Sequence, residues 1–328
     1  MSQLTRICLS LGRNALQAIP TVLVVVVLSF FLLKLAPGDA ADYAAAESGA
    51  ASAESVADIR HSYGLDLPVR TQLLNYLGKL SHMDLGVSQR FGTPIIDLIA
   101  ERLPSTLVLM STAILGALII GISMGTFMSL YAGRWPDRLA STVTQFFYSV
   151  PAFWIGMMLI VIFSVKLDWL PSGGSKTIGS ATAGLGWLID RTKYIVLPSL
   201  SLMLYYMGIY ARITRVSMIE SLHREHVRTA TAKGLSRRNV IIRHVLRNAL
   251  IPITSVAGMH IAGILGGAVV VETVFNWPGM GRLAYEAVMA REPQILMGIM
   301  IVCALMVIVT NAFFDLIQTI LDPRVEVR

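Results

Sequence analysis

Charged residues and cysteines are scarce in this chain of 328 residues: 14% are charged, whereas 55% are hydrophobic. This composition lies well outside the usage of ordinary soluble domains. The two cysteines, Cys8 and Cys303, are far apart, which argues against a disulfide framework or a thiolate metal site. The net charge of +7 would suggest nucleic acid in a soluble protein, but here the basic residues lie in loops beside apolar runs. We therefore expect an integral membrane protein with no nucleic-acid partner.

Motifs for nucleotide, metal or nucleophilic chemistry are also missing. Gly78 and Lys79 lack the upstream glycine and the following Ser or Thr of a phosphate-binding loop. His223 and His226 have the wrong spacing for the zinc-protease motif. We therefore predict no catalytic residue, no metal site and no cofactor in this chain, and an intramembrane protease is excluded.

Six apolar runs are long enough to cross a bilayer. The first is too long for the apolar part of a cleavable signal peptide, so we expect it to be retained. Loops assigned to the inside are richer in Lys and Arg than their neighbours, which predicts that both termini are cytoplasmic. The predicted fold is an all-α, multi-pass membrane protein with six transmembrane helices. Their expected ranges are 15–35, 104–131, 139–166, 194–216, 251–271 and 295–321.

Three parts follow from this pattern: the N-terminus and first helix at 1–35, an extracytoplasmic segment at 36–103, and a five-helix core at 104–328. Residues 36–100 carry eight acidic and four basic side chains, which fits the outer side. Thr93 and Pro94 begin a predicted helix that ends near Leu103 and lies along the membrane interface.

The cytoplasmic loop at 217–250 is strongly basic, with nine basic and two acidic residues between Arg212 and Leu250. Its pattern predicts a helix over 217–233 that is capped by Gly234, then an interfacial helix over 236–249. We interpret the first as a docking helix for a cytoplasmic partner. The alternative is a basic loop that only follows the positive-inside rule.

Several short motifs are spread along essentially the whole chain. They are Ala36-Pro-Gly-Asp39, Tyr63-Gly-Leu-Asp66, Asp84-Leu-Gly-Val-Ser88, Ser149-Val-Pro-Ala-Phe-Trp154, Arg228-Thr-Ala-Thr-Ala-Lys-Gly-Leu235, Asn248-Ala-Leu-Ile-Pro252, Glu272-Thr-Val-Phe-Asn-Trp-Pro-Gly-Met-Gly-Arg282 and Asp322-Pro-Arg324. Together these motifs resemble those of the permease subunits of bacterial ABC importers, in the dipeptide, oligopeptide and nickel branch. Arg228 and Thr229 stand where the general importer pattern has Glu-Ala, and Pro252 lies eighteen residues beyond Gly234, as in the peptide branch.

The resemblance implies a type I importer permease in the bacterial inner membrane that carries di- or oligopeptides, with nickel or another small solute as the alternative. It implies a second homologous permease, two cytoplasmic ATPase subunits that bind ATP and Mg, and an extracytoplasmic substrate-binding protein. The expected ATPase-docking residues are Glu225, Arg228, Thr229, Ala230, Ala232, Lys233, Gly234 and Leu235.

His260 is the one titratable side chain well inside a predicted span, so it is a candidate for the translocation path, together with Gly263 and Gly267. The alternatives are a histidine bonded to a neighbouring helix and glycines that only allow tight packing, as we also expect for Gly121 and Gly125. Proton coupling usually uses relays of carboxylates, which a single histidine does not provide. This disfavours an ion-coupled secondary transporter.

The outer stretch 272–282 follows the fifth predicted span and is rich in turn residues. We interpret it as an outer gate or a surface touched by the binding protein, and the alternative is an interfacial anchor. The candidate residues are Glu272, Trp277, Pro278, Gly279 and Arg282.

Overall fold

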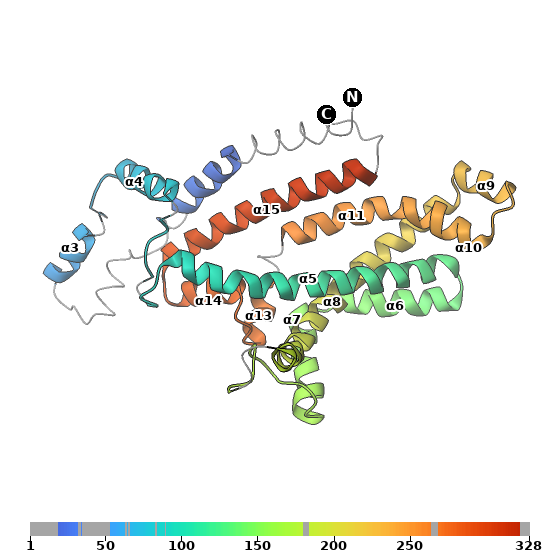
Figure 1. The fold of residues 1–328 in the computed structure, drawn as a ribbon, viewed down its shortest axis with the longest axis horizontal. Coiled ribbons are helices and arrows are strands. Elements are labelled where there is room, and N and C mark those ends of the chain that lie inside the picture. Colours follow the sequence, from blue (N-terminus) through green and yellow to red (C-terminus); the bar gives the residue numbers. More distant parts are fainter. Residues whose placement is uncertain are drawn as a thin grey trace.

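The computed structural model describes residues 19–31, 34, 53–62, 64, 66–82, 84–88, 90–179, 184–263 and 268–321. Within these ranges the chain is built from helices and the loops that join them (Figure 1). A first helix spans Ile19–Phe31. The others are α3 (Ala53–Ser62), α4 (Val69–Ser81), α5 (Ile95–Leu130), α6 (Trp135–Ser149), α7 (Ala152–Leu159), η1 (Ile160–Lys166), α8 (Leu185–Leu222), α9 (Glu225–Ala232), α10 (Arg237–Asn239), η2 (Val240–Leu246), α11 (Arg247–Ala262), α13 (Val269–Val274), α14 (Met280–Met289) and α15 (Pro293–Leu321).

Four of the described helices are long and apolar enough to cross a membrane: α5, α8, the continuous helix Arg237–Ala262, and α15 over Pro293–Phe314. A fifth is added if α6 and the helix formed by α7 and η1 count as one broken span. The predicted all-α membrane class is thus confirmed. Of the predicted first span, only Ile19–Phe31 and residue 34 lie within the described residues.

The expected boundary near Leu103 is wrong, because α5 runs without a break from Ile95 to Leu130 and contains Pro104. A proline inside a helix removes one backbone hydrogen bond and usually ends or bends it. Here the turns on both sides of Pro104 bury their apolar side chains in the same core, Ile95 and Ile99 before it and Leu109 after it. Packing therefore carries the helix through the proline.

The expected third span, 139–166, is not one straight helix. It bends by 99° between α6 and α7. Val150 has an extended backbone (φ −92°, ψ 131°) and directly precedes Pro151, a position where the proline ring disfavours helical geometry. The bend follows from that local restriction, and α7 with η1 projects from the long axis of the bundle (Figure 1).

The helices around the basic loop also differ from expectation. Arg224 is extended (φ −79°, ψ 150°), so the predicted helix 217–233 is divided into the end of α8 and the short α9. The predicted interfacial helix and fifth span form one helix, Arg237–Ala262, which ends before Val271. Residues 264–267, including Gly267, lie outside the described residues.

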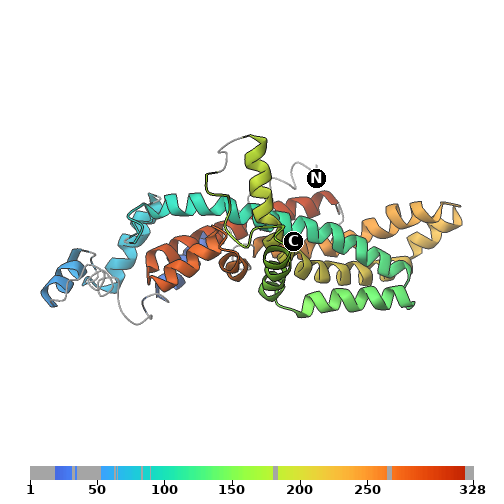
Figure 2. The ribbon, with the colours of Figure 1, turned by 90° about the horizontal axis from the view of Figure 1, so that it is seen from below.

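The core of the bundle lies where α5, α8, α11 and α15 pack together, and Figures 1 and 2 show α5, α11, α15 and the later part of α8 running along the long axis. The predicted close approach at Gly121 and Gly125 is confirmed. A Cβ atom at Gly121 would lie 2.7 Å from the Cβ of Tyr210, and one at Gly125 would lie 2.5 Å from the carbonyl oxygen of Ala211. Side chains larger than hydrogen would push α5 and α8 apart.

Candidate coupling and translocation sites

The helix α9 stands at one end of the bundle, between α8 and α10 (Figure 1). It ends in a Schellman motif, in which the N–H of Gly234 donates to the carbonyl of Thr231 (3.0 Å) and the N–H of Leu235 to that of Ala230 (3.4 Å). Gly234 has φ +78°, the left-handed conformation that the sequence predicts for the cap. The end of α9 is thus set by its own local bonding.

One face of α9 packs against the rest of the chain. Val227 and Ala230 are buried in a small cluster with Met218 of α8 and with Val240 and Val245 of η2. Ala230, one of the expected docking residues, therefore faces inward and holds α9 in place. A force applied to α9 would reach both α8 and the helix Arg237–Ala262.

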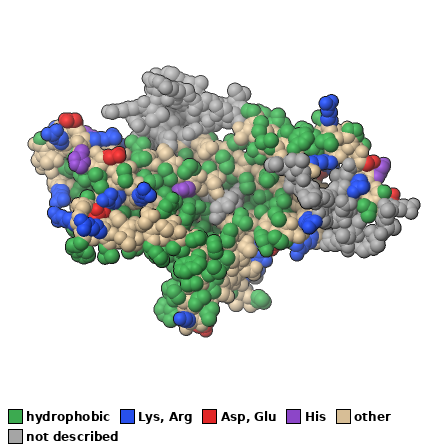
Figure 3. Space-filling model, turned by 180° about the vertical axis from the view of Figure 1, so that it is seen from behind, with side chains coloured by type: hydrophobic (Ala, Val, Ile, Leu, Met, Phe, Trp, Pro, Cys, Tyr) green, Lys and Arg blue, Asp and Glu red, His purple; other side chains and the backbone are tan. Residues whose placement is uncertain are grey.

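The opposite face of α9 is open. The side chains of Glu225 and Arg228 are 92% and 75% exposed, and they form an ion pair at 3.5 Å. Figure 3 shows basic and histidine side chains gathered at this end of the molecule. The remaining expected docking residues are exposed as well: Thr229, Ala232, Lys233, Gly234 and Leu235.

Polar contacts that sequence reasoning missed fasten α9 to the next helix. The side-chain amide of Asn248 lies 3.0 Å from Nε2 of His226 and donates to the carbonyl of His244 at 2.7 Å. Asn248 belongs to the stretch Asn248–Pro252 that resembles the importer permeases, but nothing in that pattern indicates its contact with His226.

A second missed contact ties α6 to α8 near the same end. The guanidinium of Arg215 donates to both carboxylate oxygens of Asp137, at 2.7 and 2.8 Å. Asp137 is buried and also accepts the N–H of Gly133 at 2.9 Å. This two-pronged pair holds the α5–α6 turn on α8.

His260 lies on α11 and contacts two tyrosines of α8. The hydroxyl of Tyr210 is 3.0 Å from Nδ1 of His260, and the ring centroid of Tyr206 is 4.9 Å from that of the imidazole. The expected hydrogen bond to a neighbouring helix is therefore present. His260 is only partly buried, and Gly263, one turn further, is exposed at the end of α11.

The stretch after α13 is organised around a buried carboxylate. Glu272 is fully buried and accepts the hydroxyl of Thr106 at 2.6 Å and the N–H of Arg282 at 3.0 Å. The same hydroxyl accepts the N–H of Met280 at 2.7 Å. Gly279 packs on the carboxylate so closely that a Cβ atom there would overlap it. Glu272 and Thr106 thereby hold the first turn of α14 against α5.

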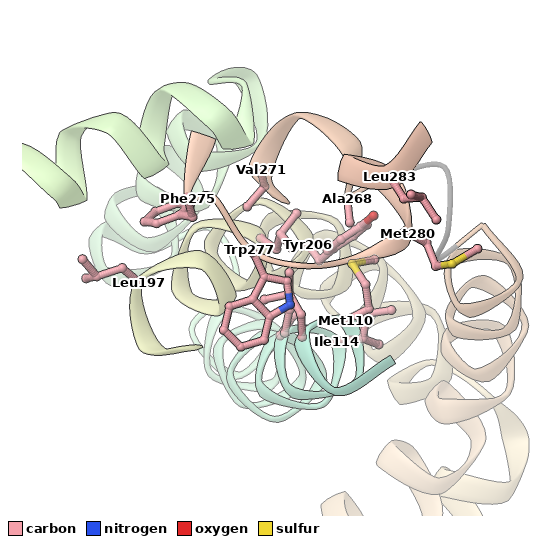
Figure 4. Close-up of a cluster of buried hydrophobic side chains, with 14 of the residues drawn as sticks. Met110, Ile114, Leu197, Tyr206, Ala268, Val271, Phe275, Trp277, Met280 and Leu283 are labelled. Atoms are coloured by element: carbon pink, nitrogen blue, oxygen red, sulfur yellow. The ribbon is translucent and has the colours of Figure 1, made fainter. Parts of the chain in front are cut away.

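Trp277 completes this corner. Its ring is 4% exposed and lies in the cluster drawn in Figure 4, and its Nε1–H donates to the carbonyl of Ser105 at 3.1 Å. Arg282 is partly exposed and donates from Nε to Glu286 at 2.8 Å. Pro278 is half-buried in the turn. The structure thus brings all five candidate residues of this stretch together but buries most of them within the chain.

Comparison with known proteins defines the class. Residues 117–327 match the family of binding-protein-dependent transport system inner membrane components, and residues 8–110 match the N-terminal part of such components. The chain belongs to this family. It is therefore a permease component in the inner membrane and not the catalytic subunit, and ATP is handled by a partner ATPase. Family membership also implies a binding-protein partner, and it sets aside an ion-coupled secondary transporter.

Individual relatives and a solved structure add detail to this comparison. A Brucella abortus (strain 2308) protein named as a peptide transport system permease is 37% identical over 95% of this chain and 97% of its own length. The glutathione transport system permease protein GsiC of Escherichia coli (strain K12) is 36% identical over the same shares. The inward-facing methionine ABC transporter MetNI has a similar fold, with a TM-score of 0.56 and 15% identity over 72% of this chain and 100% of that one.

Proposed function

We propose that this chain forms one half of a translocation path for di- or oligopeptides, paired with a second homologous permease. The support is the similarity over nearly its full length to relatives named for peptide and glutathione transport, glutathione itself being a tripeptide. Among the described residues, no three His, Cys, Asp or Glu side chains come together where they could hold a metal ion. Peptides are therefore the solute class to test before nickel.

The proposed topology has six spans with both termini in the cytoplasm, and it follows the type I importer arrangement. The described broken span of α6 to η1 and the helix Ile19–Phe31 would complete the four continuous spans. The end that carries α9 is the cytoplasmic end, since basic side chains such as Arg224, Arg237 and Arg238 are exposed there. The segment from residue 36 to the start of α5 then lies outside, before the five-helix core.

In this proposal, the exposed face of α9 is where an ATPase subunit docks. The observation that carries it is the two-sided character of α9: Glu225 and Arg228 are exposed on one side, and Val227 and Ala230 are packed on the other. Closure of two ATPases on ATP would move α9, and the buried side would transmit the motion to α8 and α11 as rigid-body rocking.

The path itself is proposed to run beside His260 and Gly263. Tyr206, Tyr210 and His260 bring polar atoms to the middle of an otherwise apolar bundle, where an ionisable group is costly unless it serves a role. The end of α11 at Gly263 is exposed, and among the described residues no side chain lies within 4 Å of a Cβ atom built there. Gly267, the other candidate glycine, lies outside the described residues.

The corner formed by α13 and α14 is proposed as the outer gate. Glu272 and Trp277 are buried, so they would act by holding α14 in place, while the more exposed Arg282 and Pro278 would be nearer to a bound substrate-binding protein. The segment before α5 is fastened to the same region, because Glu292 accepts the hydroxyl of Ser88 at 2.7 Å and the N–H of Arg90 at 2.8 Å.

The test is purification of the tagged chain from its host in mild detergent, with mass spectrometry of the partners and an ATPase assay. We expect two ATPase subunits, a second permease and vanadate-sensitive hydrolysis stimulated by a peptide-loaded binding protein. Arg228→Glu should lower ATPase recovery at least tenfold, whereas the control Arg138→Glu, exposed on α6, should not. Full recovery with Arg228→Glu would contradict docking on α9.

A further inference from the structure

A groove lies between α6 and α8, on a different side of α8 from His260. It encloses about 490 Å³ and is lined by side chains that include Met128, Ser141, Thr144, Ile209, Arg212 and Ile213. The helices touch closely at one end, where a Cβ atom at Gly208 would lie 2.7 Å from the carbonyl oxygen of Thr144. The pair of Arg215 and Asp137 joins them further toward the α9 end.

The groove carries an uncompensated positive charge. Arg215 is neutralised by Asp137, but Arg212 forms no hydrogen bond or ion pair with any residue that the structure describes. Its neighbours in the groove, Ser141 and Thr144, are neutral hydroxyls. Arg134 and Arg138, at the start of α6, are exposed nearby and add positive charge of the same kind. Arg212 is exposed, so its charge is open to a ligand, and a negatively charged group complements it.

Part of the groove wall is apolar. Met128, Ile209, Ile213 and Val216 line it, and the side chain of Val216 on α8 is 46% exposed. In a membrane helix, such side chains contact lipid chains or another helix. The occupant must thus combine an anionic group with a long apolar part, and a soluble anion satisfies only the first condition.

We propose that this groove binds an anionic phospholipid of the cytoplasmic leaflet, with the phosphate on Arg212 and an acyl chain that extends along Ile209 toward the middle of the bilayer. Basic pockets between membrane helices on the cytoplasmic side commonly bind acidic headgroups. The assignment to the cytoplasmic leaflet rests on the proposed topology, whereas the charge and the apolar wall of the groove do not depend on it. A bound lipid would hold α6 against α8, and α8 is the helix that leads into α9.

The test uses the assembled transporter in nanodiscs of phosphatidylcholine with phosphatidylglycerol, followed by native mass spectrometry of the lipids that remain bound. We expect retained phosphatidylglycerol for the natural sequence and a loss of about fivefold for Arg212→Gln, since one basic residue near the surface contributes about 1 kcal/mol. The control Arg243→Gln removes an exposed arginine of η2 that does not line the groove. Equal retention in all three would overturn the proposal.

Two further variants keep the outcome clear. Ile213→Trp fills the groove but keeps Arg212, so it should also release phosphatidylglycerol. A photo-crosslinker at Val216 should capture lipid, and capture of the second permease instead would overturn the proposal in favour of a helix–helix contact. Displacement of the lipid by inorganic phosphate would assign a free-anion site. Lipid retention is measured without a transport assay. A variant that loses the lipid can therefore be distinguished from one that loses ATPase docking on α9.

Discussion

Two short polar segments between helices, α9 and the corner of α13 and α14, have similar sequences in outline but opposite environments. Each carries an acidic residue, a basic residue and a glycine beside a turn, and each is interpreted from sequence as a contact site. The structure leaves Glu225 and Arg228 almost fully exposed, whereas it buries Glu272 completely. The first segment leaves its charges exposed, and the second uses a charge to hold its own fold.

The glycines of the two segments show the physical basis of the difference. Gly234 has φ +78°, and no atom of the described residues lies within 4 Å of a Cβ atom built on it, so its requirement is conformational. Gly279 has an ordinary φ of −111°, but a Cβ atom would overlap the carboxylate of Glu272, so its requirement is space. One glycine serves a surface turn and the other a buried contact.

The largest expected effect is at Gly279. Gly279→Ala should lower the free energy of unfolding by about 3 kcal/mol, because the added methyl group must displace a buried carboxylate and its hydrogen bonds. Thermal unfolding of the purified transporter, followed by size-exclusion chromatography, measures the loss. The control is Gly78→Ala in α4, where a Cβ atom would meet no atom of the described residues within 4 Å. This variant should be neutral or slightly stabilising. Equal midpoints for the two variants would contradict the packing argument.

The next effect is at the carboxylate itself. Glu272→Gln keeps the shape but turns one oxygen into a donor that faces the donors of Thr106 and Arg282, and it should cost about 2 kcal/mol. Glu286→Gln is the matched control, because its ion pair with Arg282 is partly solvent-exposed and should contribute less than about 1 kcal/mol. The same unfolding assay compares them, and a larger loss for Glu286→Gln would reverse the assignment.

A smaller effect is expected at Gly234. Gly234→Ala should cost about 1 kcal/mol, since a side chain disfavours the left-handed conformation, and Gly234→Asn should cost less because asparagine tolerates it. The Schellman bonds would weaken in the same order, so recovery of the ATPase should fall more with Ala than with Asn. If Gly234→Asn were worse than Gly234→Ala, steric contact with the partner would explain the site better than backbone strain.

The smallest effect on stability is expected at the exposed pair. Arg228→Ala should change the free energy of unfolding by less than about 0.5 kcal/mol, because a surface ion pair contributes little. It should still reduce peptide-stimulated ATP hydrolysis, measured with the reconstituted transporter. If Arg228→Ala lowered the free energy of unfolding but left peptide-stimulated hydrolysis unchanged, Arg228 would be a structural residue like Glu272. The contrast between α9 and the corner of α13 and α14 would then fail.

Much of the architecture was predictable because the bilayer imposes long apolar helices. The spans near α5, α8 and α15 and the left-handed glycine at 234 follow from local composition and turn chemistry. The prolines were less predictable. Pro104 lies inside a helix and Pro151 begins one after a sharp bend, although both have the same local restriction. The packing around each decides the result.

The candidate sites also have features that the sequence predicts and contacts that only the tertiary structure shows. Charge and periodicity were enough to identify α9 as an exposed basic segment, because its bonds are local. They could not show that Asp137 pairs with Arg215, that Tyr210 contacts His260, or that Thr106 bonds Glu272 across 166 residues of sequence. No local pattern marks such partners.

The sequence alone therefore determined the class, the approximate positions of most membrane helices and the left-handed conformation of Gly234 at the end of α9. These depend on hydrophobicity, charge and backbone preference, which each residue carries with it. The tertiary structure decided which polar side chains are buried, which glycines must stay small, and that α6 and α8 enclose a groove with an unpaired arginine. Those features arise only when distant segments meet, because burial and contact are properties of pairs of helices.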